Sequence, residues 1–331
     1  MIEIIHPGIL ATIQDLGREG FRSLGVGVSG AMDRLALRIG NTLLGNPEDA
    51  AGIETTLGGL ICRFDVDCPF AVTGAVSELY LDEKPVPGGS VVLARAGQVL
   101  EIMSPSIGMR SYVSFAGGID VPAVMGSRST DLKGGFGGHS GRPLRQGDRL
   151  DLLPAAFPRH RVREFGLSIR DAGMRLAEDV TEVRMIPAAE WEDCSPEARE
   201  QFLGTNWIID QISNRVGYRL IGPSLAHGTP RELLSHGILP GTIQLPPSGQ
   251  PVVQMSDANT CGGYPKLGVV IQSDLWKLGQ AQLGKAVRFH RVTPGQAIQA
   301  MHEERALLAA VRGLAALALG NGETSGSGCS P

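Results

Sequence analysis

The segments RVGYRL (residues 215–220), PGTIQLP (240–246) and DANTCGGYPK (257–266) lie close together in the most informative stretch of this chain. Their glycines let the backbone turn with positive φ or approach a ligand closely, and the polar side chains between them supply charge and hydrogen bonds. This composition is typical of a site for a small anionic or amide-like molecule, or of polar turns in a loop-rich β fold. Arg215 and Arg219, four residues apart, and the Tyr-Pro-Lys after a double glycine favour the site.

Short apolar runs between Gly and Pro extend this pattern along the chain. Runs such as 60–64, 70–73 and 110–115 are rich in Val, Ile, Leu and Phe, and the chain has 45 Gly and 21 Pro. Helical periodicity is clear in 32–44, 196–203 and 294–319 and weaker in 273–278. The pattern predicts a mainly-β protein of barrels or sandwiches with few helices.

A change of composition near 154–164 divides the chain, because a Pro- and Arg-rich segment there follows an apolar run. We predict an N-terminal β lobe over 1–155, a C-terminal β lobe over 160–293 and a C-terminal helix over 294–319. The last residues, 320–331, are rich in Gly and Ser and are predicted to be disordered.

Composition excludes several classes of function. The 331 residues are 42% hydrophobic with a net charge of −4 and no basic stripe, so neither nucleic acid nor an anionic membrane is an expected partner. The start has no signal-like pattern, and no window approaches the ~20 apolar residues of a membrane span, so we predict a cytoplasmic protein. Five Cys without a C-x-x-C and seven His without ligand spacing indicate reduced thiols and no metal site.

The N-terminal half contains further polar segments flanked by glycine, among them SGAMD (29–33) and GSRST (126–130). Ser29 is suited to capping the helix that follows, with Asp33 in its first turn, or Asp33 belongs to the site. Arg128 is suited to holding a carboxylate or carbonyl oxygen, or to bridging loops. The glycine-rich segment 134–142 lacks the order of a phosphate-binding loop, and we find no ATP site in the chain.

Six motifs together resemble the KipA/PxpC family, also called allophanate hydrolase subunit 2 or biotin-dependent carboxyltransferase-like proteins. They occur in family order over roughly residues 1–295: TIQDLGR (12–18), SGAMD (29–33), GGIDVP (117–122), GSRST (126–130), RVGYRL (215–220) and GGYPK (262–266). The resemblance implies two mainly-β lobes, the C-terminal one a cyclophilin-like barrel, and similarity to the carboxyltransferase part of urea carboxylase. Many members are the third subunit of an ATP-dependent 5-oxoprolinase, which opens the lactam of 5-oxoproline to glutamate.

Residue chemistry and this resemblance together give the candidate site. Opening a lactam requires polarisation of a C=O group, neutralisation of an oxyanion and handling of protons on nitrogen. We expect catalytic roles for four residues: Asp257 to orient or take a proton, Arg215 and Lys266 to stabilise an oxyanion or hold a carboxylate, and Tyr264 to donate a hydrogen bond. The substrate-binding residues are expected to be Arg128, Ser127, Asp33, Asn259, Thr260, Gly262 and Gly263.

The chain departs from the family pattern at two positions of the segment 257–265. Asn259 stands where the family leads us to expect Gln, and Cys261 where we expect Thr. Asn259 draws the amide back by one methylene, and Cys261 loses a hydroxyl donor. Both changes bear on which substrate the chain takes.

The resemblance therefore predicts a carboxyltransferase-like subunit of a 5-oxoprolinase complex that is inactive alone. It implies no cofactor on this chain, with ATP on partner subunits of the KipI/PxpB and PxpA types. Two alternatives remain open at this point. One is the carboxyltransferase component of a biotin-dependent urea or amide carboxylase, with biotin on a partner, and the other is a non-catalytic KipA-like regulator that binds a KipI-type kinase inhibitor.

Overall fold

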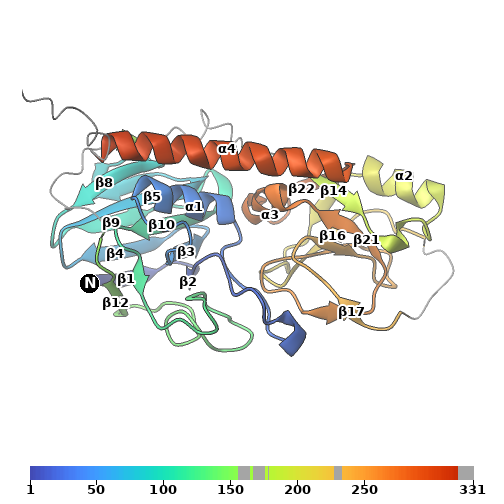
Figure 1. Ribbon diagram of the computed structural model, residues 1–331, viewed down its shortest axis with the longest axis horizontal. Coiled ribbons are helices and arrows are strands. Elements are labelled where there is room, and N and C mark those ends of the chain that lie inside the picture. Colours follow the sequence, from blue (N-terminus) through green and yellow to red (C-terminus); the bar gives the residue numbers. More distant parts are fainter. Residues whose placement is uncertain (156–164, 167–175, 178, 227–232, 320–331) are drawn as a thin grey trace, which may run out of the picture.

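The computed structural model describes residues 1–155, 165–166, 176–177, 179–226 and 233–319. The predicted tail over 320–331 and most of the segment between the predicted lobes lie outside these ranges. Two β lobes lie side by side, and one long helix, α4 (Pro294–Ala318), runs along both of them (Figure 1). The prediction of a mainly-β protein with few helices is confirmed.

The N-terminal lobe is built from two antiparallel sheets. The first has seven strands, in the order β11 (Ile119–Asp120), β12 (Arg149–Leu152), β1 (Ile2–Pro7), β4 (Leu60–Phe64), β9 (Val99–Ile102), β6 (Leu79–Leu81) and β7 (Lys84–Pro85). The second has six, in the order β13 (Phe165–Gly166), β8 (Ser90–Ala94), β5 (Cys68–Val76), β10 (Ile107–Phe115), β3 (Gly52–Thr56) and β2 (Leu10–Gln14). Although β13 follows residue 155, it pairs with β8 of this lobe.

The core of this lobe lies between the two sheets. Ile2, Ile4 and Phe64 come from the first sheet, and Phe70 and Phe115 from the second. The ring of Phe64 is 5.1 Å from that of Phe70 and 6.1 Å from that of Phe115. Such aromatic contacts add to the apolar burial that joins two sheets of a sandwich.

The C-terminal lobe is a closed seven-stranded barrel, so the expected barrel is confirmed. Its strands follow the order β14 (Val180–Pro187), β21 (Lys266–Val270), β18 (Thr242–Gln244), β19 (Val252–Gln254), β16 (Gly217–Ile221), β15 (Trp207–Ile209) and β22 (Ala286–Arg291). Strand β14 pairs in parallel with β22. A separate two-stranded ribbon consists of β17 (His236–Gly237) and β20 (Cys261–Gly262).

Helices form where the sequence predicts them, with small shifts at their ends. The α-helices are α1 (Arg34–Leu43), α2 (Pro196–Gly204), α3 (Leu275–Gln280) and α4, and the short 3₁₀ turns are η1 (Arg22–Leu24), η3 (Ala189–Trp191) and η4 (Gln272–Asp274). Asp33, rather than Ser29, caps α1, because its Oδ1 accepts from the N–H of Ala36 at 2.8 Å. Ser29 instead lies in a left-handed turn with φ of 53°, so that expectation for its role was wrong.

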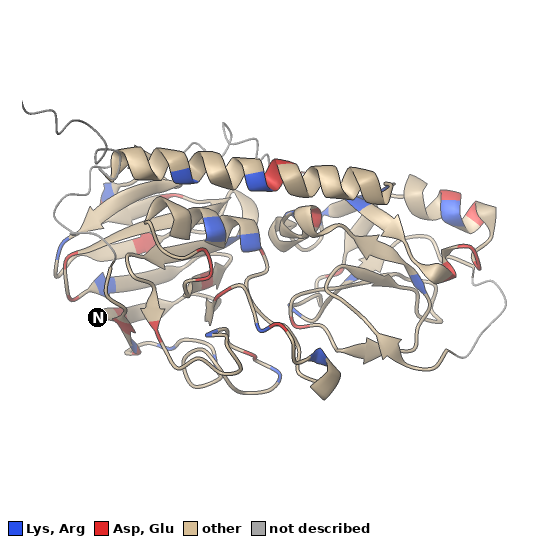
Figure 2. Ribbon diagram, in the orientation of Figure 1, with Lys and Arg blue, Asp and Glu red and all other residues tan. Residues whose placement is uncertain are grey.

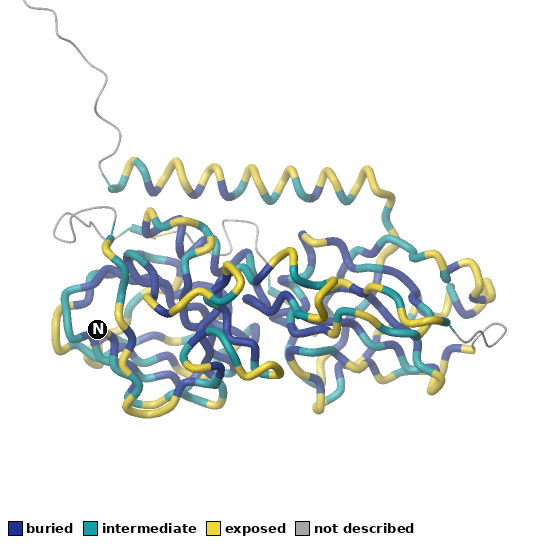
Figure 3. The backbone as a smooth tube through the Cα atoms, turned by 60° about the horizontal axis from the view of Figure 1, so that its bottom comes forward, coloured by how far each residue is buried: buried dark blue, intermediate teal, exposed yellow. Residues whose placement is uncertain are grey.

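Helix α4 begins next to the barrel and returns over the N-terminal lobe. Its start is fixed by a capping box in which Thr293 and Gln296 satisfy each other's backbone N–H groups. Its buried residues Leu308 and Val311 pack with Leu35 and Ile39 of α1, and buried and exposed positions alternate along its length (Figure 3). Within the described part of the chain, no helix is long and apolar enough to span a membrane.

Candidate active site at the junction of the lobes

A buried arginine joins the two lobes. Arg215, in the loop before β16, donates from Nε and Nη2 to the two carboxylate oxygens of Asp257, both at 2.9 Å. From Nη1 it reaches Glu54 of the N-terminal lobe at 2.5 Å, and Nη2 also donates to the carbonyl oxygen of Gly30 at 2.7 Å. Arg215, Asp257 and Glu54 are 4%, 7% and 2% exposed. The guanidinium is therefore a fixed part of the interface between the lobes.

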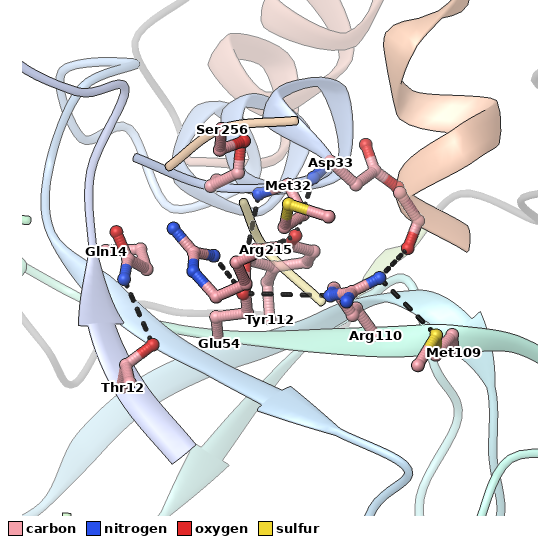
Figure 4. A network of polar contacts seen from close by, with 12 residues as sticks. Thr12, Gln14, Met32, Asp33, Glu54, Met109, Arg110, Tyr112, Arg215 and Ser256 are labelled. Carbon is pink, nitrogen blue, oxygen red and sulfur yellow. Dashed lines mark hydrogen bonds and ion pairs between the residues drawn. The ribbon is translucent and has the colours of Figure 1, made fainter. Parts of the chain in front are cut away.

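Glu54 is the centre of this network in the N-terminal lobe (Figure 4). Its Oε2 accepts from the hydroxyl of Tyr112 at 2.7 Å and from the N–H of Met32 at 2.8 Å. Burial alone raises the pKa of Glu54, but Arg215 and Arg110 outweigh burial and hold that pKa below its ordinary value. Arg110 also donates to the hydroxyl of Tyr218 in the barrel at 2.8 Å. Charges of both signs alternate through the junction, which is how buried charges are tolerated.

A cavity of about 400 Å³ opens above this network, between loops of the two lobes. Asp257 is in its wall, so one carboxylate belongs both to the buried network and to the cavity. The segment 257–261 supplies one side, and loops 25–29 and 131–136 supply the other. The lining residues with polar side chains are Ser29, Asp131, Lys133, Asp257, Asn259, Thr260 and Cys261.

The loop 131–136 carries a second carboxylate above a second buried arginine. Arg18 is 1% exposed, its guanidinium carbon lies 4.7 Å from the centre of the Phe136 ring, and it donates to the carbonyl oxygen of Ser129 at 2.6 Å. Its Nη1 is 3.9 Å from Asp131 Oδ2. Asp131 and Phe136 line the cavity, so Arg18 contacts two residues of its wall without lining it.

Lys266 is buried in the barrel, on β21, and does not line the cavity. It is 7% exposed, and Gln244 lies opposite it in the pairing of β21 with β18. Among the described residues, the Nζ of Lys266 and the Nε2 of Gln244 are buried without a hydrogen-bond partner. Burial lowers the pKa of Lys266, an effect that Glu190 partly opposes. The ribbon strand β20 covers this part of the barrel, since a Cβ at Gly262 would come within 2.7 Å of Gln244 Nε2.

The double glycine is explained by this close packing. A Cβ at Gly263 would lie 2.9 Å from the carbonyl oxygen of Leu233. At Gly263 the neighbour is backbone and leaves no room for a side chain, whereas at Gly262 a side chain would require Gln244 to move. Tyr264, which follows them, is 48% exposed and is not among the residues that line the cavity.

The three substrate-binding candidates from the N-terminal lobe do not line the cavity. Asp33 is fully buried, caps α1 and accepts from Gln280 Nε2 of the barrel lobe at 2.7 Å. Burial raises the pKa of Asp33 to about 7. Ser127 donates to Asp15 Oδ1 at 2.7 Å, and the backbone N–H of Arg128 donates to Asp15 Oδ2 at 2.5 Å. These residues shape the loops around the site.

Four residues of the site were not among the candidates from sequence: Arg18, which lies in the motif TIQDLGR (12–18), and Glu54, Asp131 and Lys133. Glu54 offered a signal, because it interrupts an otherwise uncharged strand, GIETT (52–56), and a buried carboxylate needs a cationic partner. Across the described ranges, no three His, Cys, Asp or Glu side chains come together as metal ligands would.

The junction of two β lobes, one of them a closed barrel, therefore contains a polar cavity next to a buried ion network. The model of the family described as "Carboxyltransferase domain, subdomain A and B" matches residues 24–291. The chain belongs to this family, as the sequence motifs predicted.

Two bacterial relatives match over more than nine tenths of the chain, and both are C subunits of 5-oxoprolinase. The chain is 42% identical over 309 residues to the one from Escherichia coli strain K12, covering 92% of this chain and 96% of that protein. It is 39% identical over 312 residues to the one from Haemophilus influenzae, covering 94% of this chain and 98% of that protein.

A solved structure has the same fold within a longer protein. The crystal structure of the Kluyveromyces lactis urea carboxylase superposes with a TM-score of 0.86 at 28% identity. The match covers 94% of this chain and 29% of that one. The fold of this chain therefore corresponds to one segment of the yeast enzyme.

Proposed function

We propose that this chain is the carboxyltransferase-like subunit of a 5-oxoprolinase complex, which hydrolyses 5-oxoproline to glutamate with ATP. The observation that carries the proposal is the match to two bacterial 5-oxoprolinase C subunits over at least 96% of their length. The cavity between the lobes supports it, since a carboxylate, an amide, hydroxyl groups and a cation meet there around a space for a small molecule.

The reaction adds one water across the ring amide. The water oxygen bonds to the ring carbonyl carbon, the C–N bond of the ring breaks, and the nitrogen takes up protons as it leaves. We assign to Asp257 the acceptance of the substrate N–H or of a proton from the attacking water. Arg215 holds both oxygens of Asp257 and so fixes the direction in which this carboxylate faces. Arg215 is a positioning residue in this scheme.

Lys266 and Tyr264 take less direct roles in this proposal. Lys266 lies beneath the ribbon and contributes a positive charge to the wall behind Thr260 and Cys261. Tyr264, half exposed at the end of the ribbon, is placed to contact a partner subunit or a substrate held between subunits. Asn259 and Thr260 offer an amide and a hydroxyl to the substrate.

The energy for the reaction comes from partner subunits. We propose that ATP is bound by subunits of the KipI/PxpB and PxpA types, that this chain carries no cofactor and that it does not turn over 5-oxoproline alone. Because the reaction consumes ATP, we also propose that the complex is located in the cytoplasm.

The test is ATP-dependent glutamate release from 5-oxoproline by the full chain, alone and with its candidate partner subunits. We expect activity only in the mixture, and a fall in kcat of about 100-fold or more in Asp257→Asn. Asp193→Asn, at an exposed aspartate of the same lobe, is the matched control and should retain activity. Co-purification with the partners and a circular dichroism spectrum show whether each variant is folded and assembled.

An assembled mixture without glutamate release contradicts the proposal. The second candidate, a carboxyltransferase component acting on urea or another amide, is favoured by the TM-score of 0.86 to urea carboxylase. It predicts urea-dependent ATP hydrolysis in the presence of a biotin carboxylase and a biotin carrier, with no response to 5-oxoproline.

A further inference from the structure

Lys133 reaches from one lobe to the other across the cavity. It lies in the loop 131–136 of the N-terminal lobe, and its Nζ donates to Oδ1 of Asn259 in the C-terminal lobe. Both residues line the cavity. The contact joins residues that are 126 positions apart in sequence.

The carboxylates of the cavity are already matched by buried guanidinium groups. Asp257 is bonded through both oxygens to Arg215, and Asp131 lies 3.9 Å from Arg18. Glu54, outside the cavity, is shared by Arg215 and Arg110. Asp15 does not line the cavity and accepts hydrogen bonds from hydroxyl and backbone N–H groups.

Lys133 differs from these arginines in its partner. Within the described residues it forms no ion pair with a carboxylate, and its hydrogen bond goes to a neutral amide. An ammonium group has three donors, and a carboxylate is a stronger acceptor for it than an amide oxygen. Lys133 is exposed, and among the described residues of the cavity wall it is the one cation, without a carboxylate partner.

We propose that Lys133 binds the carboxylate of the substrate, so that the cavity selects a lactam or amide that carries a carboxylate over an uncharged amide. The inference rests on the proposed function and adds to it the residue that binds the substrate carboxylate. Asn259 holds the ammonium of Lys133 in place before the substrate binds. The incoming carboxylate then either replaces Asn259 as the acceptor or shares the ammonium with Asn259.

The positions of Asp257 and Asn259 fit such a substrate. They are two residues apart in one segment of the wall, so an acceptor for N–H and the ammonium of Lys133, which is bonded to Asn259, line the same cavity. In 5-oxoproline, the ring N–H is next to the carbon that bears the carboxylate. One molecule can therefore meet Asp257 through its N–H and Lys133 through its carboxylate.

The experiment compares 5-oxoproline with 2-pyrrolidinone, the same lactam without the carboxylate. In the assembled complex, Lys133→Met should raise KM for 5-oxoproline about tenfold or more and leave kcat within a few fold. Lys133→Arg, which keeps the charge, should recover most of the loss. Lys84→Met, at an exposed lysine of β7 outside the cavity, is the matched control and should have no effect. Competitive inhibition by 2-pyrrolidinone should be weak and equal in wild type and Lys133→Met.

The outcomes separate this inference from the proposed function. If the wild-type complex turns over 5-oxoproline and Lys133→Met leaves KM unchanged, the role of Lys133 is wrong while the proposed function stands. If the wild-type complex is inactive, the proposed function fails, and calorimetric titration of the full chain with 5-oxoproline decides on Lys133. Binding that weakens tenfold in Lys133→Met supports the inference, whereas no binding, or equal binding of 2-pyrrolidinone, overturns it.

Discussion

The two lobes are held together in two chemically different ways. Under the cavity, Arg215 and Glu54 join them through a buried ion network in which each of these two residues is less than 5% exposed. Along the outside, α4 joins them through apolar packing of Leu308 and Val311, with ion pairs at its edge. The first contact is polar and enclosed, whereas the second is apolar on the inside and belongs to a helix with few charged residues (Figure 2).

The difference separates positioning from stability. A buried ion network costs desolvation free energy and is weak evidence for stability, but it fixes its members in one arrangement once it is complete. Apolar packing of a helix contributes stability without fixing polar groups. The network therefore positions Asp257 at the cavity, while α4 keeps the lobes associated.

The largest expected effect is that of breaking the network at its centre. Arg215→Met leaves Asp257 buried without its cation and leaves Glu54 with Arg110 alone, which should lower the free energy of unfolding by about 3–5 kcal/mol. Glutamate release by the assembled complex should also be lost, because Asp257 is no longer held. Urea denaturation followed by circular dichroism measures the first effect.

Arg219→Met is the matched control for this change. Arg219 is the second arginine of the same motif, but its side chain is exposed on β16. Its replacement should change the free energy of unfolding by less than about 1 kcal/mol. Equal destabilisation by the two variants would contradict a special role for the buried arginine.

The contrast between Arg215 and Arg219 also shows how far sequence could lead. The motif indicated a site, and the alternation of β16 leaves Arg219 in solvent, whereas Arg215 lies in the loop before this strand. The partner of Arg215 could not be predicted, because Glu54 is 161 positions away and the pairing is set by how the lobes dock. Local periodicity predicts which face of a strand is buried, but not what it is buried against.

The cavity shows the same limit. The segment 257–261 was predicted from its own composition, since its polar side chains lie together in one loop. Lys133 and Asp131 lie just before the glycine-rich segment 134–142, for which the sequence indicated no ligand, and only the fold brings them opposite Asn259. The sequence therefore predicted the side of the cavity that one continuous segment, 257–261, supplies. It did not predict the side that the loop 131–136 of the other lobe supplies.

A second prediction concerns how the free energy of unfolding depends on pH through Asp33, whose N–H donates to Tyr112 of the buried network. Burial raises the pKa of Asp33 to about 7, whereas an unfolded aspartate titrates near a pKa of about 4. Between these values the folded protein binds a proton that the unfolded chain does not, so the contribution of Asp33 to stability falls as pH rises from about 4 to 7. The slope is at most about 1.4 kcal/mol per pH unit.

Asp33→Asn removes this titration and keeps an oxygen that can cap α1. The free energy of unfolding of wild type minus that of Asp33→Asn should therefore be larger at about pH 5 than at about pH 7.5. Taking the difference between the two proteins cancels the pH-dependent contributions of the other titratable groups, which both proteins share. A difference that does not change with pH would show that Asp33 is ionised over the whole range.

The smallest effect is expected where α4 meets water. Arg312 pairs with Glu48 as Arg215 pairs with Glu54, but the side chain of Arg312 is 65% exposed. Its ion pair is screened and replaces hydrogen bonds to water, so Arg312→Met should change the free energy of unfolding by about 0–1 kcal/mol. The change should shrink further in about 1 M salt, whereas that of Arg215→Met should persist, since salt does not reach a buried pair. A loss at Arg312 as large as that at Arg215 would mean that the outer contact of α4, and not the network under the cavity, fixes how the lobes meet.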